Sequence, residues 1–183
     1  MPAEIRIYFE GERLLKPGFD AFFKDLRQRA REKRCGFLLI SARSGAQARQ
    51  DFETSLQTNR TAWSILLIDS EGPLPRRGGS HAGRTFWMVE MMEAWFHADK
   101  DALAEFYGDG FKKIALKPNP KVEEIPKADL ERGLKAATRG CSKGAYHKTA
   151  HAPTLLGRIR PDLVREAAPN CNRLFQAIRK HLN

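Results

Sequence analysis

The stretch Trp63-Ser64-Ile65-Leu66-Leu67-Ile68 is a nearly continuous apolar run that ends in Asp69. A short run of this kind, bounded by polar residues, is typical of a strand that is covered on both faces. Two further segments have the same character. They are Ile5-Arg6-Ile7-Tyr8-Phe9, which ends in Glu10-Gly11, and Gly36-Phe37-Leu38-Leu39-Ile40. We therefore expect three buried parallel strands.

Helical spacing of apolar residues separates these strands. It predicts one helix over about 18–33 and another over about 46–56. Strand–helix–strand–helix–strand implies right-handed crossovers and a parallel sheet with helices on both faces. The Gly-, Pro- and Arg-rich stretch from Glu71 to Arg84 predicts a long loop without helix or strand. The remaining expected elements are a short strand at 86–89 and helices near 91–97, 101–107, 127–137, 149–159 and 169–181.

The net charge of +10 is unevenly distributed. Residues 1–111 hold 16 Lys and Arg against 16 Asp and Glu, whereas residues 112–183 hold 16 against 6. We expect an α/β core over 1–111 and a basic, mostly helical extension over 112–183 that packs on it as one compact domain. A one-sided basic region suits a polyanion such as nucleic acid. A solvated surface, or a face for an acidic partner, is the alternative.

Composition excludes several classes of protein. No stretch approaches the roughly 18 to 20 apolar residues that cross a bilayer, so we expect no membrane partner. The N-terminus lacks a basic region followed by an apolar one, which predicts a cytoplasmic protein without a signal peptide. Cys35, Cys141 and Cys171 form no C-x-x-C pair, so neither a zinc knuckle nor a disulfide framework is expected. Cys141, in a polar loop, is the cysteine to test for reactivity.

Acidic residues stand where two of the predicted strands end. Glu10 ends the first, and Asp69 ends the third with Glu71 two residues on. Ligands of open parallel sheets bind outside the carboxyl ends of the strands. If the first and third strands are neighbours, these carboxylates come within metal-bridging range, and hard oxygen ligands suit Mg²⁺ or Mn²⁺. The alternative is that each acid caps a helix or faces water.

A further acid lies on the predicted helix after the fourth strand. Glu93 and His97 are four residues apart and share one face, opposite an apolar face that we expect in the core. Glu93 would supply a further metal ligand or a general base. An ordinary contact between Glu93 and His97 is the alternative.

The segment from Thr138 to His151 mixes glycines, cations and an aromatic residue. Arg139, Lys143, His147 and Lys148 predict a loop that contacts phosphate, and Tyr146 offers a ring for stacking on a base. A surface turn between two helices is the alternative. His147 and His151 have the H-x-x-x-H spacing of zinc proteases, but Lys148 stands where the catalytic Glu belongs, which argues against a zinc site.

Several blocks together resemble the bacterial domain-of-unknown-function family 4276 (DUF4276). They are Ile5–Gly11, Leu66–Glu71, Met91–Asp99, Glu123–Asp129 and Thr138–Lys148. The resemblance covers nearly the whole chain. This family is in turn similar to the Toprim superfamily, the metal-binding α/β domain of topoisomerases, primases and overcoming-lysogenisation-defect nucleases.

The resemblance implies a Toprim-like parallel sheet flanked by helices. It also implies a metal site in which Glu10 matches the first acid and Asp69-Ser70-Glu71 matches the D-x-D motif, with Glu in the last place. Toprim-like members often lie beside ATPase genes in anti-phage defence modules. The expected function is therefore a Mg²⁺- or Mn²⁺-dependent phosphodiesterase, a nuclease on DNA or RNA, in such a module. In that function Glu10, Asp69, Glu71 and Glu93 are catalytic.

Two other functions stay open. In the first, the chain is a non-catalytic partner or regulator of an associated AAA- or ABC-type ATPase. In the second, the acidic site serves nucleotidyl transfer in a ligase-type enzyme.

Overall fold

The computed structural model describes residues 2–74 and 81–183. Within them, a parallel sheet has the strand order β2-β1-β3-β4. Its strands are β1 (Glu4–Glu10), β2 (Gly36–Ala42), β3 (Ala62–Asp69) and β4 (Thr85–Met88). The predicted α/β class and all four predicted strands are confirmed.

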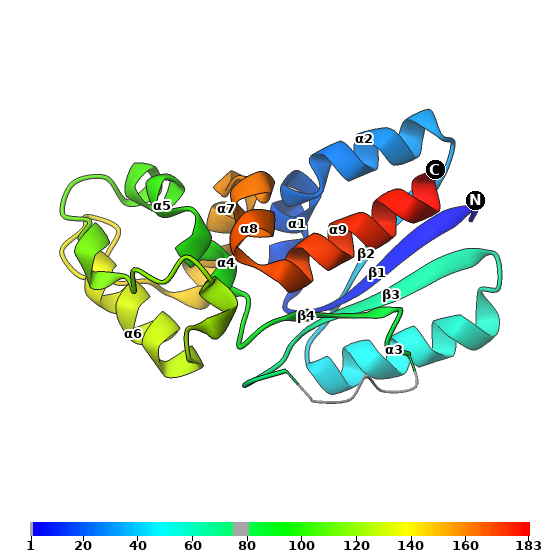
Figure 1. Cartoon of the computed structure of the whole chain (residues 1–183), viewed down its shortest axis with the longest axis horizontal. Helices are drawn as coiled ribbons and strands as arrows, with labels where there is room; N and C mark the ends of the chain where they lie inside the picture. Colours follow the sequence, from blue (N-terminus) through cyan, green and yellow to red (C-terminus); the bar gives the residue numbers. More distant parts are fainter. Residues whose placement is uncertain (1, 75–80) are drawn as a thin grey trace.

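The first and third strands are neighbours. Ile5 of β1 lies opposite Trp63 of β3, and Phe9 lies opposite Leu67. Because parallel strands end at the same edge, Glu10 and Asp69 reach one edge of the sheet. In Figure 1 this edge points toward the helical half of the molecule, away from the two chain termini.

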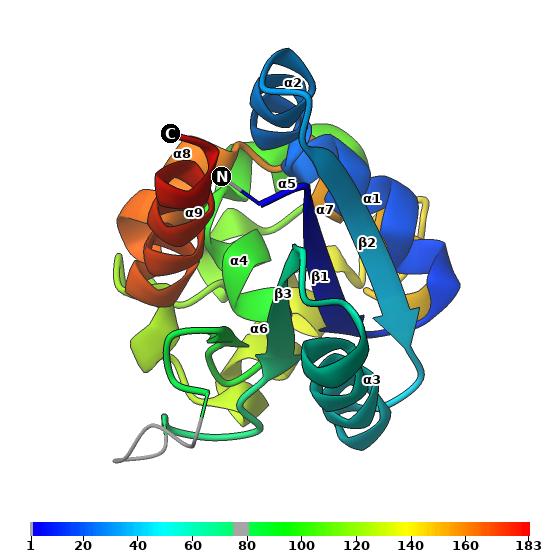
Figure 2. The same cartoon turned by 90° about the vertical axis from the view of Figure 1, so that its right-hand side faces the viewer.

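Helices cover both faces of the sheet. α1 (Lys16–Phe22), α2 (Lys24–Glu32) and α9 (Pro169–Leu182) pack on one face, and α3 (Gly45–Thr58) covers the other (Figures 1 and 2). Alternation along β1 explains the two layers, because successive side chains of a strand point to opposite faces. Ile7 and Phe9 join the large core under α9, while Tyr8 joins a smaller core against α3.

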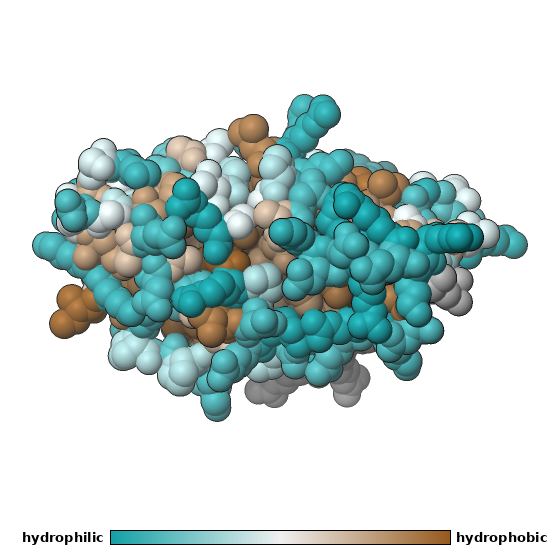
Figure 3. All heavy atoms as spheres, turned by 90° about the horizontal axis from the view of Figure 1, so that it is seen from above, coloured by the Kyte–Doolittle hydropathy of each residue, from teal (hydrophilic) through white to brown (hydrophobic). Residues whose placement is uncertain are grey.

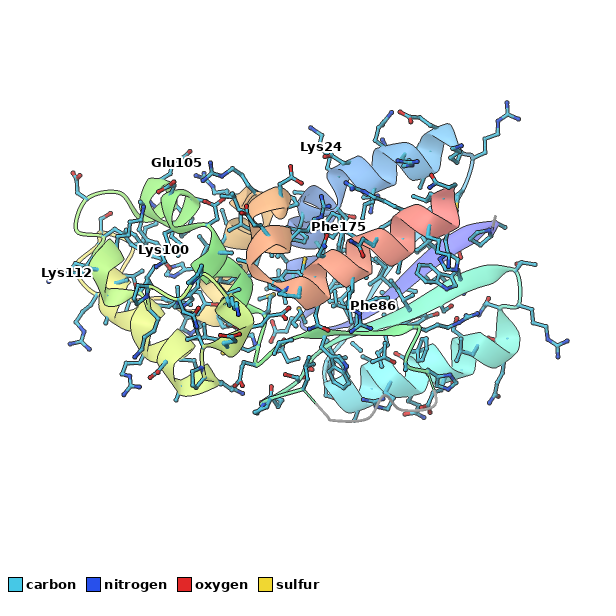
Figure 4. All side chains as sticks on the ribbon, in the orientation of Figure 1. Lys24, Phe86, Lys100, Glu105, Lys112 and Phe175 are labelled. Carbon is cyan, nitrogen blue, oxygen red and sulfur yellow. The ribbon has the colours of Figure 1, made fainter. Side chains whose placement is uncertain are left out.

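Shorter helices build the other half of the molecule. They are α4 (Glu93–Ala98), α5 (Lys100–Tyr107), α6 (Lys127–Thr138), α7 (Lys148–Arg158) and α8 (Pro161–Ala167), with 3₁₀ turns at Arg13–Leu15, Lys113–Ala115 and Val122–Glu124. In Figure 4, Lys112 lies at the outer end of this half and Glu105 on its upper side, whereas Phe86 lies on the sheet.

One hydrophobic cluster continues from the sheet into the helical half. Trp95 of α4 is fully buried, and the Phe22 ring stacks on it with centroids 5.0 Å apart. Phe175 of α9, labelled in Figure 4, meets the other side of Phe22 edge-on at 5.7 Å. These ring contacts hold α1, α4 and α9 at fixed positions around the carboxyl edge of the sheet.

The predicted helix over 18–33 is wrong in one respect: it is two helices, α1 and α2, which break at Phe23. Phe22 and Phe23 are both buried, and Phe23 has φ −94° and ψ 15°. The break lets two consecutive rings, which point about 100° apart on a continuous helix, both enter the core. Of the predicted loop 71–84, the described residues 71–74 and 81–84 form neither helix nor strand, and residues 75–80 lie outside the described part.

In the part of the chain that the structure describes, no helix is both long and apolar enough to cross a membrane. The face in Figure 3 is mostly hydrophilic, with isolated hydrophobic residues.

Candidate metal centre

Asp69 is the buried acid at the carboxyl edge of the sheet. It ends β3, and its side chain is 6% exposed. Its Oδ1 accepts a hydrogen bond of 2.9 Å from the backbone N–H of Met92, just before α4. Asp69 therefore joins the end of β3 to the start of α4 and is fixed in orientation.

Burial raises the pKa of Asp69 from 3.8 to about 7. The ammonium of Lys148 opposes this rise, while the nearby charges of Glu93 and Glu10 add to it. A pKa this high means that the surroundings of Asp69 do not compensate the negative charge of its ionised form. This is the electrostatic condition that a bound cation relieves.

Glu93 is the second buried acid, with only 1% of its side chain exposed. Its Oε1 accepts a hydrogen bond of 2.8 Å from the hydroxyl of Tyr146. Its Oε2 is buried and has no hydrogen-bond partner among the described residues. An unsatisfied buried carboxylate oxygen is costly and calls for a cation or a donor nearby.

Among residues 2–74 and 81–183, Lys148, the first residue of α7, forms ion pairs with both buried acids. Its Nζ lies 3.7 Å from Oδ2 of Asp69 and 3.8 Å from Oε2 of Glu93. Both distances are those of ion pairs rather than of short hydrogen bonds. The ammonium therefore lies between the two acids.

Glu10 completes the acidic group from β1. Its carboxylate lies against Gly45, the first residue of α3: a Cβ built on Gly45 would come within 2.9 Å of Oε2 of Glu10. Only a residue without a side chain leaves this position undisturbed. The positive end of the α3 dipole also favours a carboxylate here.

Glu10 and Asp69 share a pocket of about 190 Å³. Acidic and basic groups both reach it, and apolar side chains line the rest. The lining residues are Glu10, Gly11, Glu12, Leu14, Leu15, Arg43, Asp69, Met92, Lys148, Thr149 and Pro153.

Glu71, predicted as a metal ligand with Glu10 and Asp69, is held elsewhere. Its carboxylate pairs with Lys127 at the start of α6, and its side chain is 58% exposed. The backbone explains the direction. Glu71 has φ 58° and Glu90 has φ 63°, and the N–H of Glu71 donates to the carbonyl of Glu90 at 3.1 Å. Non-glycine residues rarely adopt this left-handed conformation. Here it directs the side chain of Glu71 away from Asp69 and toward Lys127.

His97, offered as a partner of Glu93, faces another neighbour. Its Nε2 lies 3.1 Å from the carbonyl of Leu130 in α6, and the ring is 2% exposed. Burial lowers the pKa of His97 to about 4. Both Glu93 and His97 are buried along with the apolar side chains of α4, and each is hydrogen-bonded to a different residue, His97 to Leu130 and Glu93 to Tyr146.

The segment 138–151 is divided between the site and the surface. Lys148 reaches the acids, whereas Lys143 lies over the ring of Phe106, 5.3 Å from its centroid. Arg139 is exposed at the end of α6. His147 caps α7, with its Nδ1 3.4 Å from the backbone nitrogen of Ala150. The structure thus brings one of the four predicted phosphate contacts to the cluster.

Two residues of this segment are more enclosed than their place in a polar loop suggested. Tyr146 is 7% exposed and bonded to Glu93, so its ring is not free to stack on a base. Cys141 is buried as well, and burial raises the pKa of its thiol, which disfavours the reactive thiolate. The thiol lies in a tight turn after α6, where the carbonyl of Gly140 closely approaches Gly110.

Sequence reasoning missed Tyr146 and Arg43 as parts of the site. A single tyrosine in a polar loop gives no sign of a partner 53 residues away. Arg43 did carry a signal: it follows β2 directly, at the same edge as Glu10 and Asp69.

The donor set suits a hard divalent cation, because it offers carboxylate oxygens and one buried oxygen without a hydrogen bond. It is not a ready-made cage. Among residues 2–74 and 81–183, no three or more His, Cys, Asp or Glu side chains are grouped closely enough to hold a metal ion. Between Asp69 and Glu93, the positive charge comes from Lys148.

The fold and the site define an α/β protein with a carboxylate cluster at the carboxyl edge of a parallel sheet. The chain belongs to the DUF4276 family, a domain of unknown function, whose model matches residues 11–179. No curated protein and no solved structure matches the chain. Glu10 lies one residue before the matched segment.

Proposed function

We propose that this chain is a Toprim-like, Mg²⁺- or Mn²⁺-dependent phosphodiesterase that cleaves DNA or RNA in a bacterial anti-phage defence module. The observation that carries the proposal is the approach of two buried acids, Asp69 at the end of β3 and Glu93 at the start of α4, to one ammonium, with Glu10 at the end of β1 on the same pocket as Asp69. Their mutual repulsion and burial create a place that favours positive charge.

Asp69 would hold the ion together with Glu10 or Glu93. When bound, a divalent ion supplies Lewis acidity toward a phosphoryl oxygen and lowers the pKa of a water molecule. Met92 N–H and the Tyr146 hydroxyl fix the orientation of Asp69 and Glu93. Arg43 and Lys148, on the same pocket, would orient the phosphate.

Backbone strain near the cluster supports a functional role for this edge. Glu71 and Glu90 both have positive φ, and the carbonyl of Met88 and the hydroxyl of Ser70 further tie the two strands' ends together. Strained non-glycine residues concentrate at functional sites. The parallel sheet, with Glu10 and Asp69 at its carboxyl edge, also supports the proposal, since the Toprim resemblance implies both; Glu71 departs from it by pairing with Lys127.

The proposal is tested by incubating the purified chain with plasmid DNA and with RNA, with and without Mn²⁺. We expect metal-dependent cleavage that Asp69→Ala abolishes while the fold remains intact. The control is Asp109→Ala, which removes an exposed acid from the outer end of the helical half. Full cleavage activity of the Asp69→Ala protein would contradict the assignment of Asp69 as a metal ligand.

One observation favours a second candidate, a non-catalytic partner of an AAA- or ABC-type ATPase. Glu71 and Glu93, both predicted catalytic, are engaged by Lys127 and Tyr146. Absence of cleavage even with such an ATPase present would favour this candidate.

A further inference from the structure

Lys148 lies close to both buried acids, in the position where a cation would balance their charge. Its Nζ is 3.7 Å from Asp69 and 3.8 Å from Glu93, and it reaches the oxygen of Glu93 that no hydrogen bond satisfies. Its side chain is 51% exposed, although both acids are buried. The lysine therefore approaches from the solvent side of the pocket, and movement into the pocket does not require the core to open.

The segment before Lys148 is fixed more firmly than the lysine itself. Tyr146 N–H donates to Oγ1 of Thr138 at 2.7 Å, and the Tyr146 hydroxyl donates to Glu93 at 2.8 Å. Tyr146 thus holds one oxygen of Glu93 by a short bond, and Lys148 faces the other across a longer gap. Of the two contacts, the lysine's is the one that can be exchanged.

We infer that Lys148 is a resident counter-ion that occupies the cation position between Asp69 and Glu93 and competes with a divalent metal ion for it. This inference rests on the proposed function and adds its regulation. An ammonium and a divalent ion cannot share two carboxylates without strong repulsion. Metal binding therefore requires the ammonium of Lys148 to leave. Until it leaves, the ammonium balances the negative charge of Asp69 and Glu93.

A phosphate group bound in the pocket would give the displaced ammonium a new partner. Arg43 and Thr149 line the same pocket as Lys148. A phosphate group there would attract Lys148 away from the acids. Binding of phosphate and binding of the metal ion would then favour one another, because coupling between two ligands is reciprocal.

The test is titration of the full chain with Mn²⁺ alone, in the absence of nucleic acid, by isothermal calorimetry. We expect Lys148→Met to bind Mn²⁺ about tenfold more tightly than the wild type, since a coupling of about 1.4 kcal/mol corresponds to tenfold. Lys148→Arg keeps the charge and should restore weak binding. Lys135→Met is the matched control: it removes an exposed lysine of α6 that does not line this pocket, and should change affinity by less than about threefold.

A second readout is thermal unfolding. Without metal, Lys148→Met should unfold at a lower temperature than the wild type, because two buried acids lose their counter-ion, and Mn²⁺ should raise its midpoint more. Equal or weaker Mn²⁺ binding by Lys148→Met, with normal binding by the wild type, overturns the inference and leaves the proposed function standing. If neither protein binds Mn²⁺, both are overturned.

Discussion

The hydroxyl of Tyr146 donates a 2.8 Å hydrogen bond to Oε1 of Glu93, across 53 residues of sequence. This bond joins the segment before α7 to the first residue of α4, and it lies beside the acids at the edge of the sheet. Desolvation, together with the charge of Glu93, raises the pKa of Tyr146, so the hydroxyl stays protonated and remains a donor. The orientation of a buried acid thus depends on a residue from a distant loop.

Tyr146→Phe should destabilise the protein by about 1–3 kcal/mol, because a buried carboxylate oxygen loses its donor. Urea unfolding measures this change. We also expect weaker Mn²⁺ binding, since Glu93 is no longer oriented.

The matched control for that variant is Tyr107→Phe. The Tyr107 hydroxyl lies 2.9 Å from Nδ1 of His151 and is hydrogen-bonded to neither Asp69 nor Glu93. It should lower stability and leave Mn²⁺ affinity unchanged. Equal loss of affinity in both variants would contradict a specific role for Tyr146.

Stability of the metal-free protein should depend on Asp69. Its pKa of about 7 in the folded state lies above the ordinary value of 3.8, so the folded state binds the proton more tightly. The contribution of Asp69 to the free energy of unfolding is therefore largest below pH 4. It falls as the pH rises from 4 to about 7, and the protein stays less stable above that pH. The predicted loss is on the order of a few kcal/mol.

Asp69→Asn isolates this contribution. The amide cannot ionise, so the difference in unfolding free energy between Asp69→Asn and the wild type should favour the variant more at pH 8 than at pH 4. Denaturant unfolding across this range gives the difference directly. A difference that is flat with pH would show that Asp69 has an ordinary pKa.

Much of this arrangement follows from the sequence, because it depends on local patterns. The apolar runs ending in Glu10 and Asp69 predicted two strands, and pairing of β1 with β3 brings their ends to one edge. Side-chain direction was not predictable in the same way. Glu71 turns to Lys127 because Glu71 and Glu90 adopt left-handed backbone that no local pattern signals.

The helical half was predicted less completely for a related reason. The sequence located α4, α5, α6, α7 and α9, but it says nothing about which loop residue meets which helix. The helix α8 (Pro161–Ala167) was not predicted, because a single buried residue, Val164, gives no repeat of apolar positions. Contacts such as that of Tyr146 with Glu93 arise only from tertiary packing.

Gly45→Ala should weaken Mn²⁺ binding several-fold without lowering stability. The new Cβ would come within 2.9 Å of Oε2 of Glu10 and push this carboxylate aside, whereas alanine itself favours the helix. Gly72→Ala, whose Cβ would meet nothing within 4 Å, is the control. Calorimetric titration of both variants measures the effect; unchanged affinity in Gly45→Ala would argue against Glu10 as a ligand.

The variants Glu71→Gln and Glu93→Gln should show which of these two acids takes part in metal binding. The pair of Glu71 with Lys127 is largely exposed and contributes little to stability. We expect Glu71→Gln to bind Mn²⁺ within about threefold of the wild type and Glu93→Gln to lose at least about tenfold, or roughly 1.4 kcal/mol. The reverse order would restore Glu71 to the metal site.

The most direct test of the acidic metal site is anomalous diffraction from a crystal of the full chain soaked in Mn²⁺. We predict a peak within coordination distance of Asp69, with Glu10 or Glu93 as a further ligand and with Lys148 moved from its place between Asp69 and Glu93. An ordered, soaked crystal with no peak at these carboxylates, or with Mn²⁺ only elsewhere, would contradict the account.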